Sequence, residues 1–154
     1  MELARSAGVG AAIALVAVSI TSLALAHSGA TGAVKVRMDS MKSIANDMKA
    51  ISTTLRNKQL RYGLIGAAAN RVEGHSARVP TEFRERDLSH PTEAAALIWD
   101  QFDDFARLSR DMEVAARSLE AAALEKAGPK IIVERFQARG ATCGACHRSY
   151  RIKN

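Results

Sequence analysis

A five-residue segment near the C-terminus, Cys143-Gly144-Ala145-Cys146-His147, constrains the fold of this 154-residue chain more than any other feature. Two thiols three positions apart, followed directly by an imidazole, form the Cys-x-x-Cys-His pattern that attaches a c-type haem. On a helical turn, each thiol can form a thioether to one haem vinyl group, and the imidazole then lies beside the iron as a ligand. The sequence therefore predicts one covalently attached haem c and a fold that encloses it.

Three other interpretations of the pattern compete with haem attachment. A disulfide-exchange pair favours a strand-then-helix setting near a βαβ pattern, which the sequence does not show. A zinc site needs roughly four ligands, and the histidines outside the motif are His27, His75 and His90. The third is chance. Because Cys143 and Cys146 are the two cysteines of the chain, none is left for a disulfide framework. We favour haem attachment, provided that the chain reaches an oxidising compartment.

The first 26 residues have the composition of a secretory signal. A positive charge near the start, an uncharged stretch over residues 8–26 and the small-x-small sequence Ala24-Leu25-Ala26 fit the rules for a cleaved leader. We therefore expect a mature domain over residues 27–154 in the periplasm of a bacterium. A retained membrane anchor is the alternative, since about 18 apolar residues are marginally enough to span a bilayer.

Net positive charge is concentrated in the last part of the chain. The formal net charge is +6, and residues 125–154 hold seven Lys or Arg against two Glu, a net of +5. An export signal and the lack of a nucleic-acid motif argue against nucleic acid as the partner. We expect a positive rim that offsets the two haem propionates and steers an acidic redox partner.

The composition and the apolar periodicity predict an all-α fold, an antiparallel four-helix bundle. Aromatic residues are 5% of the chain and prolines number three, which suits closely packed helices. The expected helices span residues 33–56, 59–73, 92–126 and 129 to near the end, with a stop at Gly74 and a surface loop over 75–91 that Phe83 anchors.

Two segments that contain glycine lead to separate predictions. The small residues 66–69 predict close approach of another helix. Gly140 falls inside the last helix at a cost of about 1 kcal/mol relative to Ala. We therefore expect either an interruption there or a bulky group, such as a haem edge, packed against this glycine.

With these features together, the sequence resembles the class II cytochromes c, the family of cytochrome c′ and its low-spin relatives. The resemblance covers the mature chain and places the haem on the C-terminal helix of a four-helix bundle. Four local patterns carry it: Arg37-x-x-x-Met41-Lys42, Ile98-Trp99 with Phe102 and Phe105, the motif Cys143 to His147, and Tyr150-Arg151. The charged stretch 75–91 departs from what the family leads us to expect.

The resemblance implies roles for four residues besides the motif. Arg37 would contact a haem propionate, Met41 would lie on the distal face of the iron, Trp99 would line the pocket, and Arg151 would lie near His147 on the proximal side. Alternatives remain for three of them: Arg37 as a solvated helix residue, Trp99 as core, and Arg151 as a helix end.

The sixth position of the iron decides between two functions. If Met41 binds iron, His147/Met41 ligation favours Fe(II) and suits electron transfer. If Met41 only lines the pocket, a five-coordinate high-spin iron binds NO or CO. Met38 and Met48 are weaker ligand candidates, and His75 and His90 are expected to be solvated.

The first expected helix shows no acid/base group for a haem peroxidase, so we expect an electron carrier and no enzyme. Ala- and Gly-bearing faces on the first two helices suit a homodimer, by analogy with the family.

Overall fold

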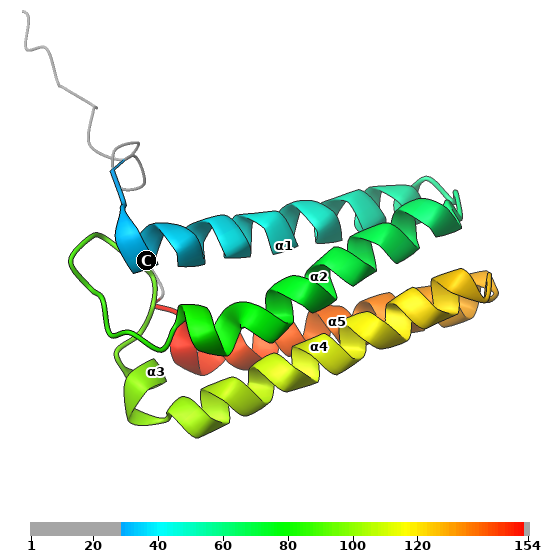
Figure 1. The fold of residues 1–154 in the computed structure, drawn as a ribbon. Helices are drawn as coiled ribbons and strands as arrows, with labels where there is room; N and C mark the ends of the chain where they lie inside the picture. Colours follow the sequence, from blue (N-terminus) through cyan, green and yellow to red (C-terminus); the bar gives the residue numbers. More distant parts are fainter. Residues whose placement is uncertain (1–28, 153–154) are drawn as a thin grey trace, which may run out of the picture.

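The computed structural model describes residues 29–152. Their regular secondary structure is helical, apart from one isolated β-bridge between Ala94 and Arg151. Five helices follow in order: α1 (Gly32–Arg56), α2 (Tyr62–Glu82), α3 (Leu97–Asp100), α4 (Phe102–Leu124) and α5 (Pro129–Tyr150). The four long helices form the predicted antiparallel bundle, and the start of α1 and the end of α5 lie at the same end of it (Figure 1). Within the described range, no helix is long and apolar enough to cross a membrane. The expected leader, residues 1–26, lies outside that range.

Helix α2 does not end at Gly74, and the loop expected from residue 75 was wrong at its start. The helix continues to Glu82 and includes Pro80. Its buried stripe extends through Ser76 and Val79, which are 0% and 2% exposed. Burial of this last part of the stripe outweighs the helix-breaking tendency of glycine and proline.

The proline in α2 is accommodated by a hydrogen bond from α4. Pro80 has no N–H, so the carbonyl of Ser76, four residues earlier, has no helical donor. Ser109 Oγ of α4 donates to that carbonyl at 2.7 Å, and Ser76 Oγ in turn donates to the Val72 carbonyl at 2.7 Å. The hydroxyl of Ser109 therefore satisfies the buried carbonyl that Pro80 leaves without a donor, and the Ser76 hydroxyl is itself paired.

The single helix expected over residues 92–126 was also wrong. Residues 92–96 are not helical, α3 is short, and Gln101 interrupts the chain before α4 begins. The cause is a long-range pairing: Ala95 N donates to the Tyr150 carbonyl at 3.1 Å, and Ile152 N donates to the Glu93 carbonyl at 2.8 Å. These bonds hold the chain extended beside the end of α5.

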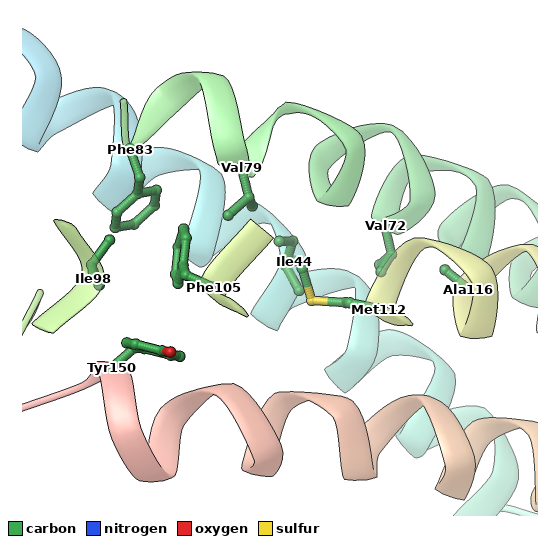
Figure 2. Packing of buried hydrophobic residues seen from close by; sticks show 9 residues of the cluster. All are labelled: Ile44, Val72, Val79, Phe83, Ile98, Phe105, Met112, Ala116 and Tyr150. Carbon is green, nitrogen blue, oxygen red and sulfur yellow. The ribbon is translucent and has the colours of Figure 1, made fainter. Parts of the chain in front are cut away.

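Two apolar clusters fill the bundle. The aromatic cluster, shown in Figure 2, consists of Ile44, Val72, Val79, Phe83, Ile98, Phe105, Met112, Ala116 and Tyr150. The aliphatic cluster consists of Ile51, Ile65, Ala68, Ala69, Leu119, Ala122, Ala123 and Ile132. The predicted close approach is present, because a Cβ on Gly66 would lie 3.7 Å from Ala123 Cβ. Helix α5 passes Gly140 without interruption. Apart from its chain neighbours and the nearby backbone of its own helix, no described atom lies within 4 Å of a Cβ built there.

The hydrogen bond that compensates Pro80 can be tested by a double-mutant cycle. Ser109→Ala leaves the Ser76 carbonyl buried without a donor, so we expect a loss of about 1–3 kcal/mol in the free energy of unfolding. In a Pro80→Ala background, the restored N–H can donate to Ser76, and the same substitution should cost much less. Chemical denaturation of the four holoproteins measures this, with half-buried Ser118→Ala of α4 as the control. Equal penalties in both backgrounds would contradict the explanation.

Candidate haem site

The two motif cysteines lie on the inward side of α5. Cys143 and Cys146 are half-buried free thiols, and Cys146 packs against the aromatic cluster. Burial, followed by the neighbouring Cys143 and Asp104, raises the pKa of Cys146 to about 11. Arg139 Nη1 donates to Cys143 Sγ at 2.9 Å. Both sulfur atoms are therefore placed at the boundary between α5 and the core.

His147 lies on the more open side of α5 and is exposed. Partial desolvation lowers the pKa of its ring, the positive charge of Arg151 lowers it further, and Glu93 opposes both. These effects favour the neutral imidazole, which is the form that ligates a metal.

Met41 of α1 packs against the same aromatic cluster as Cys146 and Trp99. It is half-buried, one turn after Arg37 on the inward stripe of α1. Met48 contacts both clusters. Helices α1 and α5 are not among the helix pairs that pack closely in the described chain, whereas α2 packs on both α1 and α4, and α4 on α5. Met41 and the cysteines thus belong to the two helices that do not pack directly on each other.

Arg37 is buried, so the alternative of a solvated helix residue was wrong. Its Nε donates to the Glu82 carbonyl at 3.0 Å, its Nη1 to the Asp87 carbonyl at 2.9 Å, and its Nη2 to the Glu85 carbonyl. The guanidinium carbon lies 5.0 Å from the centroid of the Phe83 ring. Burial lowers the pKa of Arg37, and the nearby carboxylates of Asp87 and Glu85 oppose that change. Arg37 therefore holds the connection after α2 against α1.

Trp99 and Arg151 both make contacts at the same end of the bundle. Trp99 Nε1 donates to the Phe83 carbonyl at 2.9 Å, and its ring lies 5.3 Å from the Arg37 guanidinium carbon. Arg151 is exposed and pairs with Glu93 at 2.6 Å. Trp99 is thus part of the Arg37 network, while Arg151 joins the end of α5 to the extended segment before α3.

His75 and His90, which were expected to be solvated, are half-buried, and each contacts a hydroxyl group of a residue distant in sequence. His75 Nδ1 lies 3.1 Å from Ser40 Oγ, and His90 Nε2 lies 3.0 Å from Thr31 Oγ1. Across residues 29–152, no three His, Cys, Asp or Glu side chains gather as a metal site. The zinc interpretation therefore finds no ligand set in this part of the chain.

Arg139 is one of the seven Lys or Arg residues of segment 125–154 and was not predicted to be a site residue. The side chain is 0% exposed, and its Nε and Nη2 atoms have no hydrogen-bond partner among the described residues. Its signal in the sequence was its register: Arg139, Cys143, Cys146 and Tyr150 follow one another at four- and three-residue steps on one helix face.

These observations fit a covalently bound haem. Two inward thiols, a following imidazole and a thioether against the same cluster supply suitable attachment and ligand atoms. The fold and the motif together define a c-type cytochrome of the helical-bundle class.

Comparison with known proteins gives the family. The family described as Cytochrome C' matches residues 32–151, so the chain belongs to the cytochrome c′ family, whose members bind haem c covalently. Cytochrome c-556 of Agrobacterium tumefaciens (strain II Chrys) is 32% identical over 127 residues, covering 79% of this chain and 98% of the relative. Cytochrome c' of Rhodospirillum rubrum is 32% identical over 139 residues, covering 90% and 93%. The crystal structure of cytochrome c' from Thermochromatium tepidum is 25% identical, with a TM-score of 0.70, covering 79% and 95%.

The role of Arg37 in holding the connection after α2 predicts the effect of Arg37→Lys. One ammonium group cannot reproduce three donors in a planar fork. We expect a loss of about 1–3 kcal/mol in the free energy of unfolding and faster hydrogen exchange of the amides of residues 83–91. Mass spectrometry of the exchanged holoprotein measures the second effect. Exposed Arg110→Lys on α4 is the control, and exchange at the control rate would contradict the assignment.

Proposed function

We propose that this protein carries single electrons in the bacterial periplasm through haem c, with His147 as the proximal ligand and Met41 as the distal ligand. Bound haem supplies an iron that changes between Fe(III) and Fe(II). The observation that supports the proposal best is the placement of Met41: it packs on the aromatic cluster that Cys146 also contacts, although α1 and α5 do not pack closely.

In this proposal, the residues of α5 hold the cofactor and its first ligand. Cys143 and Cys146 hold it by two thioethers, and His147 binds in the neutral form that its lowered pKa favours. A methionine thioether on the opposite side stabilises Fe(II) and raises the reduction potential. Small ligand changes between the two redox states then suit rapid electron transfer.

The surrounding residues keep this arrangement rigid. Arg37 uses three of its five N–H groups on carbonyls, and the remaining two are available for a propionate. Trp99 contacts both Arg37 and the aromatic cluster. We place Arg151 beside His147, held there by its ion pair with Glu93. The exposed basic residues of α5 then steer an acidic redox partner.

A second function has one observation in its favour. Met41 is only half-buried and has apolar neighbours, so a Met41 that does not ligate would leave an apolar pocket open to NO or CO. A variant of cytochrome c' from Alcaligenes xylosoxidans has been crystallised as a nitric oxide complex, and its likeness to this chain, at 23% identity, is one of fold. The two relatives described above, named cytochrome c-556 and cytochrome c', are each 32% identical to the chain and do not separate the functions.

Substitution of single methionines of α1 separates the two functions. If Met41 ligates iron, Met41→Ala should convert a low-spin haem to a high-spin haem that binds CO readily and has a lower reduction potential. Optical spectra of the oxidised and reduced holoproteins, with and without CO, measure the change. Met38→Ala and Met48→Ala are matched controls on the same helix and should stay low-spin. A wild type that is already high-spin and binds CO would instead support the gas-binding function.

A further inference from the structure

The solvent side of α1 carries a line of cations that neither the haem motif nor the proposed function uses. Its members follow one another at steps of seven residues: Lys35, Lys42, Lys49 and Arg56. Seven residues are close to two turns of an α-helix, so side chains at this spacing lie on nearly the same face. All of them are exposed, and at 1.5 Å per residue the line is about 32 Å long.

Two further exposed cations, Lys58 and Arg61, follow directly after the helix, and we call all six residues the α1 cation stripe. Lys35 pairs with Asp39 one turn away. No ion pair of the other five is found in the part of the chain that the structure describes. By contrast, most arginines of α2 and α4 pair with carboxylates: Arg71, Arg78, Arg107 and Arg117. The charge of the stripe is thus largely uncompensated by the protein.

The net charge of the chain is divided between its segments. Residues 32–61 hold seven Lys or Arg against two Asp, a net of +5, which equals the net charge of residues 125–154. Residues 62–124 hold seven Arg against eleven Asp or Glu, a net of −4, so they hide the first basic segment in the total. The expectation of a single basic segment at the end of the chain was therefore incomplete. Figure 1 shows α1 and α4 along opposite edges of the bundle, so the α1 edge is the positive one of the two.

The chemistry of the stripe favours an extended anionic surface over a protein partner. A protein interface is centred on a few large side chains that fill pockets, and the large hydrophobic residue that α1 leaves exposed is Val36. A second copy of the chain would bring equal positive charges together. Lysine ammonium groups are hydrated point charges on flexible stems. An anionic bilayer attracts such basic segments and needs no pocket to do so.

We propose that the α1 cation stripe binds this protein to the surface of an anionic lipid bilayer, with α1 lying along that surface. The periplasm of the proposed function is enclosed by membranes, so such a surface is nearby. No helix within residues 29–152 is long and apolar enough to cross a membrane, and the stripe therefore makes a peripheral, electrostatic attachment. The exposed cations of α5 then stay available to an acidic redox partner.

Binding of the exported holoprotein to sucrose-loaded vesicles tests the proposal. The anionic vesicles contain phosphatidylethanolamine with about one-third phosphatidylglycerol, and phosphatidylcholine vesicles are the neutral reference. Haem absorbance in pellet and supernatant gives the partition coefficient at about 50 mM and about 500 mM salt. The test variant is Lys42→Gln/Lys49→Gln. The charge-matched control is Arg110→Gln/Arg135→Gln, which removes two exposed, unpaired cations from α4 and α5.

We expect the wild type to bind the anionic vesicles, to leave the neutral vesicles unbound, and to be released at the higher salt concentration. Each cation removed from the contact lowers the partition coefficient by about fivefold, so the test variant should lose about 25-fold and the control far less. A wild type that does not bind the anionic vesicles overturns the proposal. Equal losses in the two double variants also overturn it, because they report attraction of the total charge.

Pulsed acetylation of lysines, read by mass spectrometry, tests the orientation in the same samples. Anionic vesicles should slow the acetylation of Lys42 and Lys49 far more than that of Lys130, which is exposed near the start of α5. Stronger protection of Lys130 would overturn the assignment of the contact to α1. Neither measurement depends on the spin state of the haem, so this inference and Met41 ligation can fail separately.

Discussion

The position of α5 depends on the ring of Phe105. Its centroid lies 5.1 Å from that of Phe83 at the end of α2, and 5.4 Å from that of Tyr150 at the end of α5, in an edge-to-face contact. Figure 2 shows Tyr150 pointing from α5 toward this group. Helix α5 packs on α4 and α3 but has no close packing with α1 among the described residues, and the Tyr150 contact holds the orientation of its C-terminal end, as buried Ile132 does near its start. Cys146 lies one turn before Tyr150, at the end of the helix that this contact orients.

Hydrogen bonds of the Tyr150 side chain and of its backbone also hold the end of α5 in place. The Tyr150 hydroxyl donates to Asp104 at 2.9 Å and lies 3.1 Å from Gln101 Oε1, at the break between α3 and α4. The Tyr150 carbonyl accepts from Ala95 N. One residue of α5 therefore explains both the register of the motif and the interruption of the expected third helix. A polar group buried at such a junction needs a partner, and here each partner comes from a different segment.

The parts of the fold that local pattern determines were predictable, and the parts that distant partners determine were not. The regular stripe of α1 and the Gly128-Pro129 start of α5 predicted those helices nearly to their ends. Helix α2 continues past Gly74 and Pro80 because its last turns are buried, and because Ser109, 33 residues away from Ser76, donates to the carbonyl that Pro80 leaves without a donor. The extended segment before α3 likewise depends on a strand-like pairing with the end of α5.

The same division applies to the site. The motif and its attachment chemistry are local, so Cys143, Cys146 and His147 were identified from spacing alone, and the placement of Met41 beside the aromatic cluster agrees with the stripe of α1. Whether a basic residue lies inside or outside depends on its register in α5, which the total charge does not reveal. Arg139 faces the core, whereas Lys130, Arg135 and Arg148 of the same helix are exposed.

This register gives α5 two distinct electrostatic roles. Its exposed cations act across water and salt, where their effect is screened within about 10 Å at moderate ionic strength. They therefore suit an acidic partner that comes close to the surface. Arg139 acts in a water-poor interior, where a charge interacts more strongly with its neighbours. Because His147 lies toward the open side of α5 and Arg139 toward the core, one helix carries the expected iron ligand and a buried cation on different faces. Arg139 is then not available to a partner, unlike the exposed cations of the same helix.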